Sequence, residues 1–126
     1  MSKVSKATAP QVEDLGPMVG HYGELDAYTV GFEHFREDAD ATPLFKGLPD
    51  DRCQSPHWGY VIGGSVTFRY ADREETYETG DAYYAPPGHV PVIAAGTEVV
   101  EFSPGEAYAK TMEVVGRNLA AMAATA

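Results

Sequence analysis

Short apolar segments separated by turn-forming sequences fill the chain from residue 27 to residue 102. Residues 27–35 are rich in aromatic and β-branched residues, which favour a β-strand. The same pattern predicts further strands at residues 57–70, 74–79, 81–85, 89–94 and 98–102. The intervening segments are rich in Gly, Pro and Asp, as β-turns require. Short strands at this regular spacing indicate an all-β domain, either an antiparallel sandwich or a barrel.

The two ends of the chain depart from this pattern. Residues 1–20 mix Ser, Thr, Pro, Gly and charged residues without periodicity, which predicts an arm. Beyond residue 105 the apolar residues recur at steps of four and three, the spacing of one helical face: Tyr108, Met112, Val115, Leu119 and Met122. This stripe could contact a cofactor, but packing on the barrel or on a partner subunit is the favoured interpretation. The predicted organisation is an N-terminal arm (1–20), a barrel (21–105) and a C-terminal helix (106–126).

Composition narrows the range of partners. The 126 residues are enough for one domain, with 19 Asp and Glu against 9 Lys and Arg and a net charge of −10. Such an acidic chain disfavours nucleic acid and membrane surfaces as partners. Neither a transmembrane segment nor the apolar core of a signal peptide is evident, so we expect a cytoplasmic protein. Cys53 is the only cysteine, which excludes an intrachain disulfide.

Two segments resemble the paired sequence motifs of the cupin superfamily, whose members are small jelly-roll β-barrels. The second family motif, G-x5-P-x-G-x2-H-x3-N, is similar to the segment that begins at Gly80 and contains Pro86 and Gly88. The first, G-x5-H-x-H-x3,4-E-x6-G, is similar in its second half to residues 57–64. The resemblance implies a cupin-type jelly-roll barrel, and it places Gly80 and Gly88 in tight turns, where a positive φ is expected.

The metal-ligand positions are where this sequence departs from the family pattern. Counted from the motif glycines, the four ligand positions hold Asp51, Cys53, His57 and Pro91, none of which is the family's residue type. Three of these side chains can still bind a metal, and His89 lies two residues before the fourth position. The combination Cys-x3-His-x-Gly-Tyr-Val with Pro-Gly-His is similar to a bacterial cupin subgroup to which no reaction can be attached.

Cys53, His57 and His89 are therefore the candidate metal ligands. Cys53 and His57 would share one face of an extended segment, although Pro56 disturbs strand pairing between them. Thiolate and imidazole ligands favour Zn²⁺ or Fe²⁺ over Mg²⁺ or Ca²⁺, and Ni²⁺ and Mn²⁺ stay open. The alternatives are a buried, unreactive thiol for Cys53 and structural hydrogen bonds for the two histidines.

Tyr60 and Tyr84 are the candidate substrate contacts, because some aromatic side chains of a small barrel line its interior. Tyr83 and Tyr84 are adjacent, so only one of them can face inward on a strand. Glu98 and Glu101 lie on the last predicted strand, and either would be a candidate general acid or base if it were buried, whereas exposure is usual for glutamate.

These residues predict a protein that binds a small organic molecule in the barrel beside one divalent transition metal. A metal there would act as a Lewis acid or an oxygen-activating centre, in an isomerisation, a cyclisation or an oxygenation. The alternative is a metal-free, non-enzymatic cupin that binds a metabolite or serves as an assembly module. The resemblance also implies a homodimer, since cupins commonly pair through their sheets or terminal segments.

Overall fold

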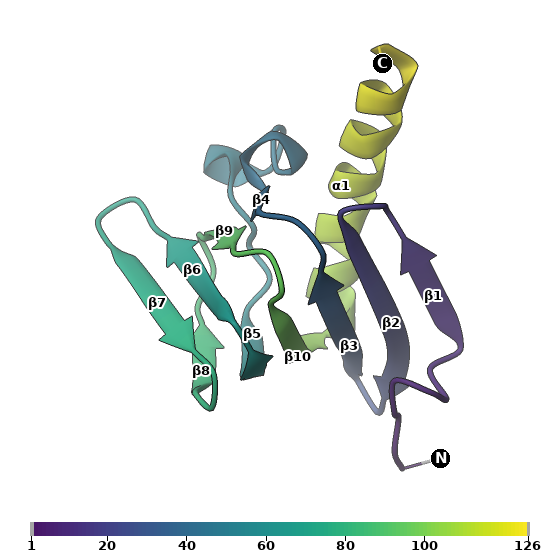
Figure 1. Ribbon diagram of the computed structural model, residues 1–126. Coiled ribbons are helices and arrows are strands. Elements are labelled where there is room, and N and C mark those ends of the chain that lie inside the picture. The colour runs from purple at the N-terminus through teal and green to yellow at the C-terminus, as the bar shows by residue number, and fades with distance from the viewer. Residues whose placement is uncertain (1, 126) are drawn as a thin grey trace.

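The structure, a computed structural model, describes residues 2–125 as two antiparallel β-sheets and one long helix (Figure 1). The six-stranded sheet has the order β1-β2-β3-β10-β5-β8, and the four-stranded sheet has the order β4-β9-β6-β7. The two sheets form the jelly-roll arrangement that the motifs imply. In chain order the elements are β1 (Gln11–Asp14), β2 (Met18–Leu25), β3 (Tyr28–Phe35), β4 (Ala39–Asp40), the 3-10 helices η1 (Thr42–Leu44) and η2 (Pro49–Asp51), β5 (His57–Gly63), β6 (Ser65–Arg69), β7 (Glu74–Glu78), β8 (Ala82–Ala85), β9 (Val90–Ile93), β10 (Glu98–Pro104) and α1 (Gly105–Thr125).

The N-terminal region contains more sheet than the sequence pattern indicates. β1 pairs with β2, and β2 pairs with β3 along its whole length, so the prediction of an arm is wrong for residues 11–14 and 18–20. A glycine hides the strand pattern of β2, since a side chain on Gly20 would overlap the ring of Tyr22. β1 lacks apolar alternation because three of its four residues are exposed.

The segment predicted as a single strand over residues 57–70 is two strands in different sheets. Gly64 separates β5 from β6 with a φ of +85°, a conformation that glycine adopts without steric cost. Gly80 and Gly88 have φ values of +92° and +96°, which confirms the turns expected at both positions. The acidic segment over residues 37–52, which lacks a strand pattern in the sequence, also contains β4 and the two 3-10 helices.

The main hydrophobic core lies between the two sheets. Alternation along each strand sends one set of side chains inward, and these include Phe35, Val61, Val66, Phe68, Tyr70, Tyr83, Ala85, Ile93 and Val99. A second cluster lies beneath α1 and consists of Phe45, Cys53, Val90 and Val115. The candidate ligand Cys53 thus belongs to the layer that the helix covers.

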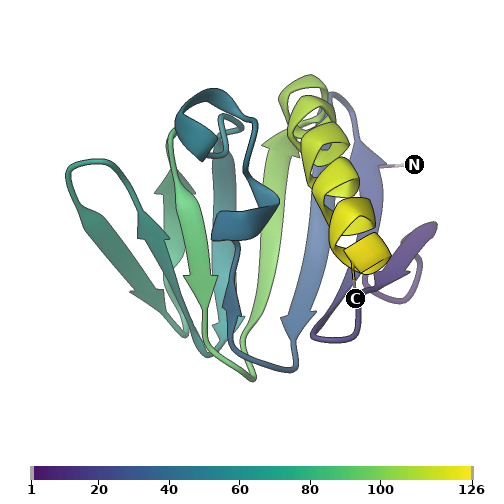
Figure 2. The same cartoon turned by 90° about the horizontal axis from the view of Figure 1, so that it is seen from above.

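The predicted C-terminal helix is present, and it packs on its own chain. Val115 is buried, and Met112 and Leu119 pack against the second cluster. Asn118 Nδ2 donates hydrogen bonds to the carbonyl oxygens of Leu44 and Lys46 at 2.7 and 2.9 Å. Seen from above, α1 lies across the six-stranded sheet beside the 3-10 segment (Figure 2). Between residues 2 and 125 no helix has the length and apolarity needed to cross a bilayer.

Candidate metal centre

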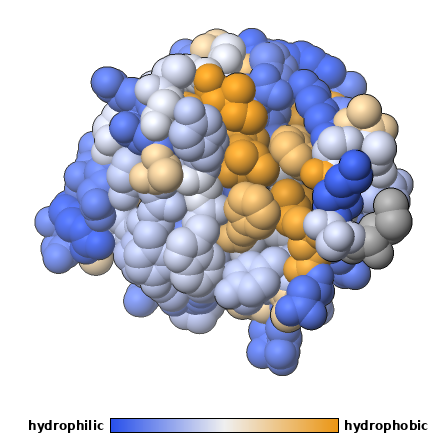
Figure 3. Space-filling model, turned by 90° about the horizontal axis from the view of Figure 1, so that it is seen from below, coloured by the Kyte–Doolittle hydropathy of each residue, from blue (hydrophilic) through white to orange (hydrophobic). Residues whose placement is uncertain are grey.

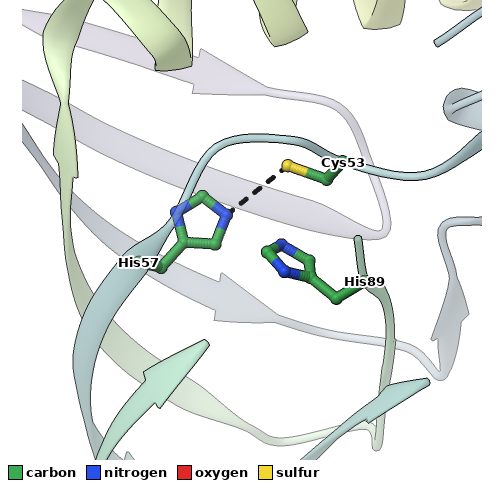
Figure 4. A group of neighbouring side chains, drawn as sticks. All are labelled: Cys53, His57 and His89. Carbon is green, nitrogen blue, oxygen red and sulfur yellow. Dashed lines mark hydrogen bonds between the residues drawn. The ribbon is translucent and has the colours of Figure 1, made fainter. Parts of the chain in front are cut away.

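Backbone pairing brings Cys53 and His89 together from distant parts of the chain. The two residues form an isolated antiparallel bridge, in which the Cys53 N–H donates to the carbonyl oxygen of His89 at 2.9 Å. The Gly88 N–H donates in turn to the carbonyl oxygen of Cys53 at 2.8 Å. His57 opens β5, where it pairs with Ala85 of β8. All three candidate side chains therefore converge on one point at the end of the barrel (Figure 4).

The three side chains form a compact, buried group. Cys53 is 1% exposed, His57 is 7% exposed and His89 is 0% exposed. The Cys53 Sγ lies 3.7 Å from His57 Nε2, and the centroids of the two imidazole rings are 4.8 Å apart. The potential ligand atoms of the three residues all lie within 4.8 Å of one another. The predicted set of ligands is thus brought together.

Hydrogen bonds fix the proton positions on His89. Its Nδ1 lies 2.7 Å from the carbonyl oxygen of Pro86, which can only accept, so Nδ1 carries the proton. The neutral ring then has a lone pair on Nε2. This atom is buried, and nothing in the described part of the chain is within hydrogen-bonding distance of it. Buried polar atoms are nearly always partnered, so His89 Nε2 has the character of a ligand atom.

His57 is held from the side opposite to Cys53. Its Nδ1 lies 2.6 Å from Ser103 Oγ and 3.7 Å from Glu101 Oε1, both on the inner face of β10. With Nδ1–H donating to Ser103, the Nε2 lone pair faces the thiol of Cys53. Metal-binding histidines commonly use such a second hydrogen bond to fix the tautomer and the orientation of the ring.

Burial determines the protonation states of the group. It lowers the pKa of His57 to about 4 and that of His89 to about 4, with a further contribution to His89 from neighbouring His57. Burial also raises the pKa of the Cys53 thiol to about 11. Near neutral pH both imidazoles are therefore uncharged, and the thiol keeps its proton until a cation displaces it.

The donor set fits a soft or borderline divalent ion. Zn–S bonds of about 2.3 Å and Zn–N bonds of about 2.0 Å put the ligand atoms of a tetrahedral site roughly 3.3–3.6 Å apart. The 3.7 Å between Cys53 Sγ and His57 Nε2 is close to that value, and the other separations, of up to 4.8 Å, exceed it by at most roughly 1.5 Å. One sulfur and two nitrogen donors favour Zn²⁺ or Fe²⁺.

Two glutamates line the inner wall of the six-stranded sheet near this group. Glu101 lies opposite Gly31 and Glu33 lies opposite Val99, so the two carboxyl groups are diagonal neighbours on one face. Tyr83 donates a hydrogen bond to Glu101, and Tyr22 donates one to Glu33 at 2.7 Å. Sequence reasoning considered Glu101 but missed Glu33, because only the strand register shows that both face inward.

The environment of the two glutamates favours the protonated acid. Burial raises the pKa of Glu101 to about 7, and burial together with the nearby Glu101 charge raises the pKa of Glu33 to about 7. Both carboxyl groups therefore titrate near neutral pH, although the pair shares its proton equilibrium. The same burial raises the pKa of Tyr22 and of Tyr83, which act as hydrogen-bond donors.

We expect Glu33→Gln to stabilise the protein increasingly as the pH rises from about 4.5 to about 7. In this window the unfolded wild-type chain releases the Glu33 proton while the folded chain keeps it, so wild-type stability falls with pH. Glutamine cannot ionise, and its carbonyl can still accept from Tyr22. Thermal melts at several pH values should show a variant advantage near neutral pH of at least about 1 kcal/mol, or roughly 3–6 °C.

Glu37→Gln is the control for this experiment, because Glu37 is an exposed loop residue. Its melting temperature should follow that of the wild type at every pH. A constant offset between Glu33→Gln and the wild type from pH 4 to pH 8 would contradict the role of burial in the titration of Glu33.

A cavity of about 570 Å³ lies between the β1–β2 hairpin and α1. Its walls include the rings of Tyr22 and Tyr108, whose centroids are 6.3 Å apart, and the carboxylates of Glu13 and Glu24. The described residues that line it include no Lys, Arg or His. Tyr22 joins the cavity to the inner wall, since its hydroxyl binds Glu33.

Tyr60 and Tyr84 do not lie beside Cys53, His57 and His89. They are 46% and 48% exposed on the outer face of the six-stranded sheet, so their expected contact with a ligand inside the barrel needs correction. Tyr60 is three positions from His57 on β5, an odd separation that sends its side chain to the opposite face. Tyr83 is the member of its pair that faces inward, where it is 6% exposed.

Comparison with solved structures identifies the fold of this chain. A protein of unknown function from Rhizobium leguminosarum superposes with a TM-score of 0.60 at 16% identity, over 82% of this chain and 95% of that one. The polyketide cyclase RemF from Streptomyces resistomycificus gives 0.58 at 13% identity, over 83% and 80%. An RmlC-like cupin from Shewanella frigidimarina gives 0.52 at 18% identity, over 75% and 83%. This chain has the cupin fold.

The cupin fold was expected from the two motifs, and the structural similarity confirms it. No family model matches the sequence, and no curated protein matches it either. Identities below 20% carry the fold and nothing about the reaction, because one fold hosts many chemistries.

Proposed function

We propose that this cupin binds one divalent transition metal through Cys53, His57 and His89, beside a site for a small organic ligand. The observation that carries the proposal is the buried, unpartnered Nε2 of His89, which belongs to a group of three donor atoms within 4.8 Å of one another. Zn²⁺ or Fe²⁺ is the favoured ion. Three protein ligands leave a coordination position for water or substrate, as in catalytic metal sites.

The metal, when bound, supplies Lewis-acid or oxygen-activating chemistry for an isomerisation, a cyclisation or an oxygenation. Ser103 orients His57 by the 2.6 Å contact with Nδ1. Glu101 is the residue best placed to hold or release a proton beside the centre, because its Oε1 lies 3.7 Å from His57 Nδ1 and its carboxyl group is held by Tyr83. Phe68 packs edge-on at 5.0 Å against the ring of His89 and helps to exclude water.

The polarity of the inner surface favours an uncharged or positively charged ligand. Glu33 and Glu101 lie on the inner wall, and Glu13 and Glu24 line the adjoining cavity, where no basic side chain lies among the described residues. Away from the metal, a phosphate or carboxylate group in that cavity would meet the carboxylates of Glu13 and Glu24 and no basic side chain among the described lining residues. That cavity, of about 570 Å³, has the volume of a small-molecule site, and it reaches the inner wall through the hydrogen bond from Tyr22 to Glu33.

Metal analysis of tag-free protein tests the proposal most directly. We expect about one equivalent of Zn or Fe per chain after purification, or after incubation with the ion and gel filtration. Protein that stays metal-free after incubation with Zn²⁺, Fe²⁺, Ni²⁺ and Mn²⁺ in turn would refute the metal centre.

A metal-free, non-enzymatic cupin is the second candidate, and one observation favours it. The protonated thiol of Cys53 already has partners, since Sγ lies 3.7 Å from the carbonyl oxygen of Ser55 and 3.8 Å from Thr111 Oγ1. In a metal-free protein, His57 and His89 contribute only to stability and to contacts with an organic ligand. The metal analysis separates the two candidates.

A further inference from the structure

The cavity between the β1–β2 hairpin and α1 combines aromatic rings with carboxylates. Gln11 of β1 lies opposite Tyr22 of β2, and Glu13 and Glu24 each follow two positions later on the same strands. Side chains two positions apart on a strand share a face, so all four lie on one face of the sheet. Tyr108 of α1 packs against this face, with its ring centroid 6.3 Å from that of Tyr22 and the two ring planes 39° apart.

We propose that this cavity binds a small organic ammonium ion, whose positive end lies against the rings of Tyr22 and Tyr108 and beside the carboxylates of Glu13 and Glu24. The cavity, of about 570 Å³, lies within the range of small-molecule sites. The inference rests on the proposed function, since it names the class of the organic ligand. None of the three proposed metal ligands lines the cavity, so the two sites can be tested separately.

The charges around the cavity favour a cation. In the part of the chain that the structure describes, neither Glu13 nor Glu24 takes part in an ion pair, and no Lys, Arg or His lines the cavity. Glu13 accepts a hydrogen bond of 3.0 Å from the side-chain amide of Gln11, which is a neutral partner. A positively charged ligand therefore supplies a countercharge that the described residues do not provide.

The aromatic rings favour an organic cation over a bare metal ion. Ca²⁺ requires about six to eight oxygen ligands, whereas much of this wall is carbon. An alkylated ammonium group is instead attracted by the negative faces of aromatic rings and needs no shell of oxygen atoms. Tyr22 offers the cavity its ring, because its hydroxyl group donates to Glu33 at 2.7 Å. Ala109 and Met112 of α1 add apolar wall.

Calorimetric titration with choline tests the proposal, with the neutral alcohol in which carbon replaces the choline nitrogen as the comparison. The two molecules have the same shape, and only choline is charged. We expect choline to bind with a dissociation constant below about 1 mM. The alcohol should bind at least about tenfold more weakly.

The same comparison excludes adsorption on exposed apolar surface. One side of the molecule carries a band of hydrophobic residues between hydrophilic margins (Figure 3). Such a surface would hold the neutral alcohol at least as well as choline. Nuclear Overhauser contacts between the choline methyl protons and the rings of Tyr22 and Tyr108 should place the probe in the cavity.

Two pairs of variants separate the ring and the carboxylate from other effects. Tyr108→Leu removes an aromatic face and should weaken choline binding at least about fivefold, whereas Tyr108→Phe keeps the ring and should bind within about twofold of the wild type. Glu13→Gln should weaken binding at least about threefold. Glu37→Gln removes the same charge from an exposed loop and should leave binding unchanged. Thermal melts confirm that each variant is folded.

Three results would overturn the proposal. The neutral alcohol could bind as tightly as choline, Glu37→Gln could weaken binding as much as Glu13→Gln does, or choline could fail to bind at millimolar concentration. The titrations are made on metal-free and on Zn²⁺-loaded protein. Choline binding by protein that retains no metal supports this inference while the metal centre fails. Protein that holds stoichiometric metal and binds no choline contradicts this inference alone.

Discussion

His89→Ala should lower the affinity of the protein for Zn²⁺ or Fe²⁺ by more than 100-fold. The substitution removes a buried ring nitrogen that has no other partner among the described residues, and with it one of only three proposed ligands. Loss of a residue that merely orients a ligand costs 10–100-fold in affinity, so loss of the ligand itself costs more. Competition with a chromophoric chelator gives the dissociation constants of the variant and the wild type.

Graded variants separate loss of a ligand from loss of fold. Ser103→Ala keeps all three ligands and removes the 2.6 Å contact with His57, so a decrease of about tenfold is expected. Cys53→Ser replaces a thiol by a hydroxyl, a poor ligand for Zn²⁺, and should also reduce binding strongly. His34→Ala should bind like the wild type. If His89→Ala binds metal with wild-type affinity while its circular dichroism is unchanged, the assignment of this ligand is wrong.

Gly64→Ala should destabilise the protein by about 3 kcal/mol or more, which is a large effect for one methyl group. The position has a φ of +85°, which costs an L-residue roughly 1–2 kcal/mol. An added Cβ would also lie 2.7 Å from the backbone Cα of Thr97, so the two connecting segments that contain Gly64 and Thr97 must move apart to admit it. Urea and thermal unfolding measure the loss, and we expect the melting temperature to fall by roughly 10 °C or more.

Gly80→Ala provides the matched control for this effect. Gly80 has nearly the same backbone angle, with a φ of +92°, but a Cβ added there would have no atom of the described chain within 4 Å beyond its own sequence neighbours. It should therefore show the conformational strain alone, about 1–2 kcal/mol. Equal losses for the two variants would mean that the contact with Thr97 contributes nothing.

Much of the fold could be predicted from local sequence. The strands from residue 74 onward are bounded by turns whose glycines have the expected positive φ, and the helix follows the spacing of five apolar residues. Local reasoning failed where long-range contacts decide the structure. Gly20 of β2 and Gly31 of β3 face the Tyr22 ring, which leaves no room for a side chain at either position, and neither segment shows this requirement by itself.

Only part of the candidate site could be predicted, because here too long-range contacts decide which residues meet. Motif positions pointed to Cys53, His57 and His89, and the structure places all three together. The sequence allows Cys53 and His57 to share a face if their segment stays extended, but it does not predict the backbone bridge between Cys53 and His89. Glu33 was missed and Tyr60 was misplaced, because which face a strand residue occupies depends on register between strands far apart in the sequence.

In the bridge between Cys53 and His89, backbone hydrogen bonds set the positions of the two residues, while their side chains supply the donor atoms. Three main-chain hydrogen bonds set where the side chains start: the Cys53 N–H donates to the His89 carbonyl oxygen, and the N–H groups of Gly88 and His89 donate to the Cys53 carbonyl oxygen. The donor groups can therefore change while the positions of the attached Cα atoms stay the same. Such a frame keeps the ligand positions fixed when one ligand type replaces another, so a thiol can occupy the position where the cupin motif has a histidine.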